Sequence, residues 1–156
     1  MSDQSIESLL TTGRIQLDRD FDDKIDAIKG LLDNIKENSD KVKDRDEALE
    51  ALKQREEEAT TGVGKGIGIP HAKTEAVEDP VIGFARAADG VDFGAQDGED
   101  ARLLFMLLFP EGSDDDYLDM LSSISRSLIH EEVREKLLEA EKEEEVMQIL
   151  EEEVSA

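Results

Sequence analysis

Hydrophobic residues recur along this chain with two periods, one typical of strands and one typical of helices. Residues 14–17 and 67–69 alternate polar and apolar side chains, which predicts short strands. A further strand is expected from Val81 to Ala87, directly after Pro80. Residues 102–109 are almost continuously apolar, which is typical of a strand covered on both faces. The pattern therefore predicts a sheet with a deeply buried central strand.

Helical spacing in the first half of the chain predicts two helices. The first carries its apolar residues between Phe21 and Ile35, and Asp20 is its expected N-cap. The second begins at Asp44, with Glu47 in the capping-box position and a buried stripe of Ala48, Leu49 and Leu52. Residues 56–66 are expected to form a loop, and the Asp-Gly pairs at 89–90 and 97–98 indicate turns.

The second half of the chain predicts three more helices. Ser113 is the expected cap of a helix whose inward residues are Leu118, Leu121, Ile124 and Leu128. Two shorter helices are expected over residues 131–140 and 142–152. Strands that alternate with helices predict an α/β fold. We expect a single domain over residues 1–156, with its core at about 12–152 and a mixed sheet of about five strands flanked by helices on both faces.

The charge of the chain narrows the range of partners. Its net charge of −23 would repel nucleic acid and anionic lipid, so neither is an expected partner. Two interpretations are an acidic interaction module and a protein adapted to a salt-saturated cytoplasm; the even spread of acidic residues favours the second. There is no cysteine, no secretory leader is evident, and the longest apolar run, residues 103–109, is too short to span a bilayer. A soluble cytoplasmic protein is therefore expected.

The candidate chemistry lies in the glycine-rich segment that ends at His71. Residues 62–71 read Gly-Val-Gly-Lys-Gly-Ile-Gly-Ile-Pro-His, and Pro70 restricts the backbone before the histidine. A rigidly held neutral imidazole is a good nucleophile. The alternative is a histidine that only caps a strand or satisfies a hydrogen bond in the core. The glycine spacing matches neither nucleotide-binding motif, and no serine, cysteine or second histidine lies nearby in sequence to complete a hydrolytic triad.

This segment resembles the enzyme IIA domains of the fructose–mannitol type of the sugar phosphotransferase system. The resemblance rests on residues 60–71 and extends through 79–84, 90–93 and 107–112, and it covers the chain from about Asp20 onward. It implies that His71 accepts a phosphoryl group from a histidine-containing phosphocarrier protein and passes it to enzyme IIB, with the membrane component IIC downstream. No metal, nucleotide or other cofactor is expected. The acidic composition adds the expectation of a halophilic archaeal source.

The resemblance also implies roles for residues around His71. Arg55 stands where the family has an arginine that supports the phosphorylated histidine, although it could instead pair with Glu56, Glu57 or Glu58, or be solvated. Backbone amides of the loop, at Gly66 and Gly68, are expected to hold phosphoryl oxygens. Tyr117 stands where members commonly have a second histidine; it could donate a hydrogen bond to phosphate, or simply pack at the start of its helix.

Other charged residues have simpler interpretations. His130 falls between two helices, where a surface or capping role is expected. Lys65 and Lys73 flank His71 and could attract phosphate or be solvated. The leading function is phosphoryl relay in sugar uptake, with fructose as the sugar that the resemblance implies. The alternatives are a regulatory nitrogen-type domain that signals through phosphorylated His71, and a non-catalytic acidic interaction module.

Overall fold

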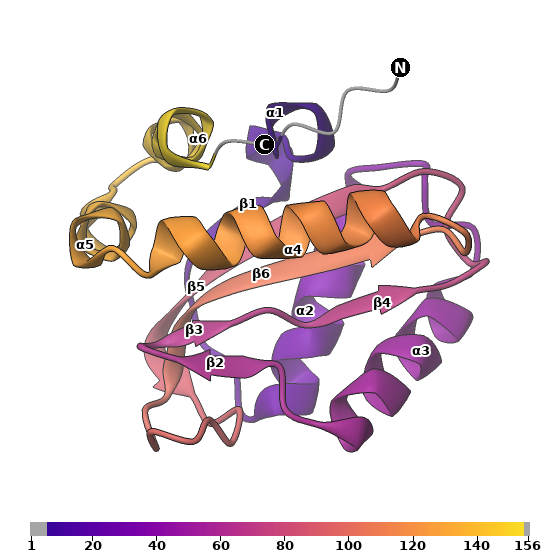
Figure 1. Ribbon diagram of the computed structural model, residues 1–156, viewed down its shortest axis with the longest axis horizontal. Helices are drawn as coiled ribbons and strands as arrows, with labels where there is room; N and C mark the ends of the chain where they lie inside the picture. Colours follow the sequence, from indigo (N-terminus) through magenta and orange to yellow (C-terminus); the bar gives the residue numbers. More distant parts are fainter. Residues whose placement is uncertain (1–5, 155–156) are drawn as a thin grey trace.

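A six-stranded mixed sheet forms the centre of the protein in the computed structural model, which describes residues 6–154. Helices cover both of its faces (Figure 1), in agreement with the expected fold class. The strands are β1 (Ile15–Arg19), β2 (Gly62–Gly64), β3 (Ile67–Gly68), β4 (His71–Lys73), β5 (Val81–Val91) and β6 (Ala101–Phe109). The helices are α1 (Ile6–Leu9), η1 (Thr12–Arg14), α2 (Lys24–Glu37), α3 (Arg45–Glu58), α4 (Asp114–Leu128), α5 (Glu131–Glu139) and α6 (Glu143–Glu153).

Strand β6 lies inside the sheet and is buried on both faces, as its continuous apolar run predicts. Leu103, Phe105 and Leu107 belong to the core beneath α4, α5 and α6. Leu104 and Met106 belong to the opposite core, beneath α2 and α3. Successive side chains of a strand point to opposite faces, so one run of residues fills two cores.

The glycine-rich segment forms the edge of this sheet beside β6. Strands β3 and β4 both run parallel to β6 and are separated by Ile69 and Pro70. The Pro70 carbonyl accepts a hydrogen bond from Leu107 N at 3.0 Å, so the backbone stays attached to β6 through the interruption. His71 is thereby placed at the start of β4, opposite Leu107.

Several expected boundaries differ from the structure. Asp23, not Asp20, caps α2, because its carboxylate accepts a hydrogen bond from Asp26 N. The predicted cap at Asp44 is confirmed, since its side chain accepts from Glu47 N at 3.1 Å. Ser113 occupies the N-cap position of α4, but its side chain makes no capping hydrogen bond.

The expected loop over residues 56–66 is wrong at both ends. Helix α3 continues to Glu58, and β2 pairs with β3 in a hairpin whose turn is Lys65-Gly66. Both turn residues have positive φ, 59° and 79°, as a two-residue hairpin turn of type I′ requires. The Asp89-Gly90 pair does not end β5 either; it lies within the strand, where the register with β6 shifts between Arg86 and Val91. The Asp97-Gly98 turn is confirmed by a hydrogen bond from Gly98 N to the Ala95 carbonyl.

Helix α4 is rotated relative to its expected orientation. Ile124 and Leu128 are buried as predicted, but Leu118 is 57% exposed, and Tyr117 and Met120 point inward in its place. Leu121 is only partly buried. Among residues 6–154, no helix is both long and apolar enough to cross a membrane.

Candidate functional site

His71 is held in one orientation by a hydrogen bond to the preceding backbone. Its Nδ1 lies 2.6 Å from the Ile69 carbonyl oxygen, two residues earlier across Pro70. A carbonyl oxygen can only accept, so Nδ1 carries the proton and, in the neutral ring, Nε2 keeps its lone pair. This confirms the expected backbone acceptor for one ring nitrogen and leaves Nε2 with an unshared electron pair.

The imidazole lines a pocket where the end of α3, the β2–β4 segment and α4 meet. The pocket has a volume of about 610 Å³. Figure 1 shows β4 at the sheet edge, between α4 and α3. Arg55 comes from the last turn of α3, Thr61 precedes β2, and Tyr117 comes from the first turn of α4. Elements far apart in sequence therefore converge around the half-buried ring of His71.

Tyr117 lies directly beside His71, in the position expected from the sequence. The two ring centroids are 5.5 Å apart, and the Tyr117 ring also packs edge-on against Phe109 at 5.5 Å. Burial raises the pKa of the Tyr117 phenol to about 12, so the phenol stays neutral at physiological pH. Among residues 6–154 its hydroxyl has no hydrogen-bond partner and is available as a donor. Both of the roles considered for Tyr117, packing and donation, are compatible with this geometry.

Arg55 borders the same pocket, and the ion pairs considered for it do not form. Its Nη1 donates a hydrogen bond to the Ala59 carbonyl at 2.9 Å, which closes the end of α3. Within residues 6–154 its guanidinium makes no ion pair with a carboxylate. Its charge adds to the lowering of the His71 pKa by burial, and it opposes part of the rise that burial causes in the pKa of Tyr117. The remaining guanidinium N–H groups are free to bind an anion at the pocket.

Glu56 is a buried carboxylate at this site whose role the sequence did not reveal. It accepts hydrogen bonds from Thr61 N at 2.8 Å and from Thr61 Oγ1 at 2.6 Å, and Lys24 Nζ lies 3.6 Å away. The Thr61 carbonyl accepts from Ile69 N at 2.9 Å, and Ile69 in turn holds His71. A continuous hydrogen-bonded chain thus runs from Glu56 to the imidazole. In sequence, Glu56 is one of three consecutive glutamates and nothing distinguishes it.

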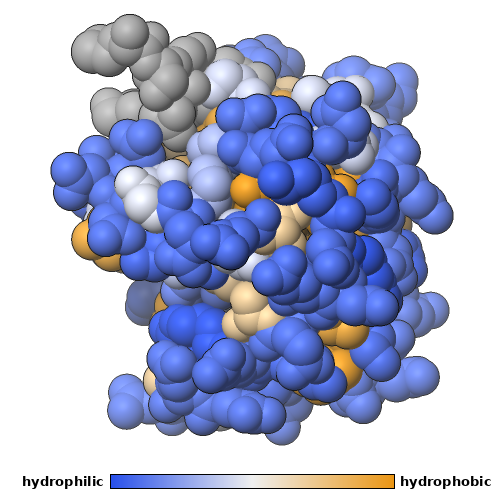
Figure 2. Space-filling model, turned by 90° about the vertical axis from the view of Figure 1, so that its right-hand side faces the viewer, coloured by the Kyte–Doolittle hydropathy of each residue, from blue (hydrophilic) through white to orange (hydrophobic). Residues whose placement is uncertain are grey.

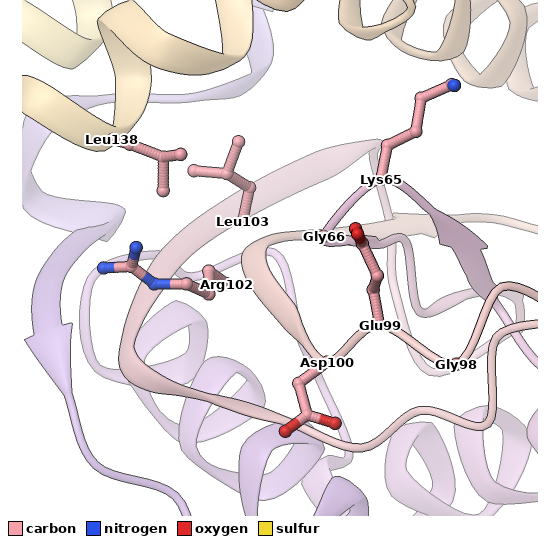
Figure 3. A pocket seen from close by; sticks show the side chains of 8 residues that line it. All are labelled: Lys65, Gly66, Gly98, Glu99, Asp100, Arg102, Leu103 and Leu138. Carbon is pink, nitrogen blue, oxygen red and sulfur yellow. The ribbon is translucent and has the colours of Figure 1, made fainter.

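The structure does not bring Gly66 and Gly68 to His71. Gly66 lines a separate pocket of about 460 Å³ with Lys65 and Arg102 (Figure 3). Close packing favours glycine at position 68, because a Cβ there would lie 2.9 Å from Leu104 Cδ2. His130, exposed at the N-cap of α5, makes no capping hydrogen bond through its side chain.

The environment of His71 predicts a pH dependence. Burial lowers the pKa of the imidazole below its usual 6.5, and Arg55 adds to this, while the hydrogen bond to Ile69 and the charge of Glu56 oppose it. The unfolded chain therefore binds the proton first as the pH falls, and the contribution of neutral His71 to stability is lost below about pH 6.5. We expect a ¹⁵N NMR titration of the His71 ring to have its midpoint below 6.5. A midpoint above that value would contradict this electrostatic picture.

Removal of the Glu56 carboxylate is expected to destabilise the protein. Glu56→Ala leaves the buried Thr61 donors without their acceptor, which costs about 2–4 kcal/mol of unfolding free energy. Glu57→Ala, one position along and exposed, is the matched control and should change stability by less than about 0.5 kcal/mol. Urea unfolding measures both. Equal effects for the two variants would show that the Glu56–Thr61 hydrogen bonds carry no net stability.

Comparison with known proteins decides the family. The sequence model described as "Phosphoenolpyruvate-dependent sugar phosphotransferase system, EIIA 2" matches residues 8–153. The chain belongs to this family. It is 57% identical over 124 residues to the fructose-specific EIIA component of Haloferax volcanii, which covers 80% of each chain. This relative supports the expected halophilic archaeal origin.

Two further comparisons place this EIIA domain among its relatives. It is 40% identical over 145 residues to the fructose-specific EIIABC component of Bacillus subtilis, a match that covers 93% of this chain and 23% of that longer protein. The nitrogen regulatory protein IIA-Ntr of Neisseria meningitidis superposes with a TM-score of 0.87 at 30% identity, covering 93% of this chain and 98% of that one. As an EIIA domain, the chain is a phosphotransferase component that relays phosphate through a phosphohistidine.

Proposed function

We propose that this EIIA domain carries phosphate for fructose uptake in the cytoplasm, with His71 Nε2 as the acceptor atom. The phosphoryl donor is the phosphohistidine of the phosphocarrier protein, and the recipient is a cysteine of enzyme IIB. The observation that carries the assignment of His71 is the hydrogen bond between Nδ1 and the Ile69 carbonyl, which leaves the Nε2 lone pair for attack. The choice of fructose rests on the 57% and 40% identical relatives, both named for that sugar.

The transfer is a displacement between two nitrogen atoms. His71 Nε2 forms a bond to phosphorus while the bond from phosphorus to the donor nitrogen breaks, and the donor ring keeps that electron pair. Because Nδ1 retains its proton, the His71 ring becomes positively charged, and the Ile69 carbonyl stabilises that charge. Arg55 and the Tyr117 hydroxyl are positioned at the same pocket to bind the phosphoryl oxygens. In the second step the cysteine sulfur displaces His71 and takes the phosphoryl group.

Exposed apolar side chains around the pocket support docking of protein partners at His71. Val63 is 55% exposed and Leu118 is 57% exposed, and both line the pocket with His71. Exposed apolar side chains that gather at one place, rimmed by polar residues, are typical of protein-binding sites. A partner protein bound to these side chains would exclude water from the phosphoryl group during transfer. It would thereby strengthen the contact between that group and the Arg55 guanidinium.

Tracing of radioactive phosphate tests this function. The chain is mixed with ³²P-labelled phosphocarrier protein and then with an IIB domain of the fructose type, of the mannitol type, or of the fructose type with its cysteine replaced by serine. We expect label on the chain first and then on the fructose-type IIB domain, with little on the other two. Label that stays on the chain with every IIB domain would contradict a transport role and favour the regulatory nitrogen-type alternative.

A further inference from the structure

The side chain that packs directly against the His71 ring is Tyr117, which carries no positive charge. A neutral phenol can donate one hydrogen bond but cannot balance charge. The phosphoryl group brings a negative charge to a protein that already carries −23. Charged hydrogen bonds to phosphate are roughly twice as strong as neutral ones. A second cation beside Arg55 would therefore stabilise the phosphoryl group more than a neutral donor such as the Tyr117 hydroxyl.

Lys73 is placed to supply that charge. It follows His71 by two residues in β4, so both side chains project to the same side of the strand, while Ala72 between them is buried in the opposite core. The Lys73 Nζ lies 5.5 Å from the centroid of the Tyr117 ring, which is itself 5.5 Å from the His71 ring. Lys73 and His71 therefore lie against one aromatic ring and line one pocket.

The Lys73 ammonium forms an exposed ion pair with Asp114 that a stronger anion can replace. Its Nζ lies 2.5 Å from Asp114 Oδ1, at the first residue of α4. The side chains are 35% and 67% exposed, and ion pairs this open to solvent contribute little to stability. A doubly charged phosphoryl group within reach competes well with one exposed carboxylate. Residues two apart in a strand are about 7 Å apart, a distance that a lysine side chain spans.

The other flanking lysine does not share this position. Lys65 lies in the β2–β3 turn and lines the separate pocket with Glu99 and Arg102. Figure 3 shows its ammonium pointing away from the Arg102 guanidinium, so the two cations do not converge on one point. The fold therefore distinguishes the two lysines that flank His71 in the sequence.

We propose that Lys73 binds the phosphoryl group on His71, and that its ammonium moves from Asp114 to the phosphoryl oxygens when His71 is phosphorylated. This inference rests on the proposed phosphorylation of His71. It assigns to Lys73 the positive charge that Tyr117 does not provide. Asp114 then serves as the resting partner of the ammonium and competes with phosphate for it.

The test compares four variants in the phosphoryl-acceptance assay with labelled phosphocarrier protein. Lys73→Met should slow acceptance by about tenfold or more, because a charged hydrogen bond to phosphate is lost. Lys73→Arg should keep most of the rate. Asp114→Asn should accept at least as fast as the unmodified protein, because it frees the ammonium. Lys65→Met is the matched control and should not change the rate. Urea unfolding of each variant checks that all are folded under the assay conditions.

The outcomes separate this proposal from the proposed function. If the unmodified protein takes up no label, phosphorylation itself is refuted. If it takes up label and Lys73→Met is as fast as Lys65→Met, only the role of Lys73 is refuted. Equal slowing by Lys73→Met and Asp114→Asn would also refute it, because the ion pair would then act only as a structural link between β4 and α4. A ¹⁵N shift of the Lys73 ammonium on phosphorylation, absent in His71→Gln, would support the switch directly.

Discussion

His71→Gln is expected to abolish phosphoryl uptake from labelled phosphocarrier protein, to below about 1% of the unmodified level, because the covalent acceptor is gone. Glutamine is close to histidine in size and can still donate a hydrogen bond toward the Ile69 carbonyl, so the fold should persist. Uptake is measured by acid-labile ³²P on the purified protein. The result follows from the geometry, since no other described side chain presents an imidazole nitrogen to the pocket within residues 6–154.

The matched control for this prediction is His130→Gln. His130 is exposed at the start of α5, with Nδ1 4.0 Å from a Glu132 carboxylate oxygen, and it does not line the His71 pocket. Its substitution should leave phosphoryl uptake unchanged. Label retained in His71→Gln and lost in His130→Gln would transfer the acceptor role to the other histidine and refute the site.

Stability is expected to rise steeply with potassium chloride. The net charge of −23 is spread over surface helices, and Figure 2 shows one face of the molecule that is mostly hydrophilic. Like charges repel over about 10 Å at 0.1 M salt but over only about 3 Å at 1 M. We expect about 3 kcal/mol more stability at 2 M than at 0.1 M, which corresponds to a Tm higher by about 6–12 °C. Thermal unfolding followed by circular dichroism measures this.

A charge reversal shows whether repulsion is the cause. Glu151 is exposed in the last turn of α6, where the helix dipole disfavours an anion and the sequence has no cation. Glu151→Lys should raise stability at 0.1 M salt by about 0.5–1 kcal/mol and have a much smaller effect at 2 M. A protein equally stable in dilute buffer and in molar salt would contradict the salt-adapted interpretation of the composition.

The elements that could be predicted from the sequence are those whose pattern has a single explanation. The apolar run of β6 fits only a strand buried on both faces, and Asp44 is followed by the donor that it caps, Glu47 N. The rotation of α4 about its axis was predicted wrongly, because its apolar positions permit two orientations on the sheet. The aromatic ring of Tyr117 takes the buried position that the leucine pattern assigned to Leu118.

The parts of the site that could not be predicted depend on contacts between distant segments. Glycine-rich β2 is too short to show alternation, so its hairpin with β3 looked like a loop that offers amides to phosphate. Glu56 is buried only because Thr61 folds back onto the end of α3. Lys65 and Lys73 differ only through the sheet, which places one at a turn and the other beside His71. His71 itself stands out in the sequence because it follows a run of glycines and Pro70, which restricts the backbone before it.

The central claim is that Nε2 of His71 is the atom that carries phosphate. The most direct test is ¹H–¹⁵N and ³¹P NMR of ¹⁵N-labelled protein phosphorylated by the phosphocarrier protein. The Nδ1–Ile69 hydrogen bond predicts that phosphorus couples to Nε2 of His71 and that the Nδ1 proton remains hydrogen-bonded. Phosphorus attached to Nδ1 of His71, or to either nitrogen of His130, would contradict the account.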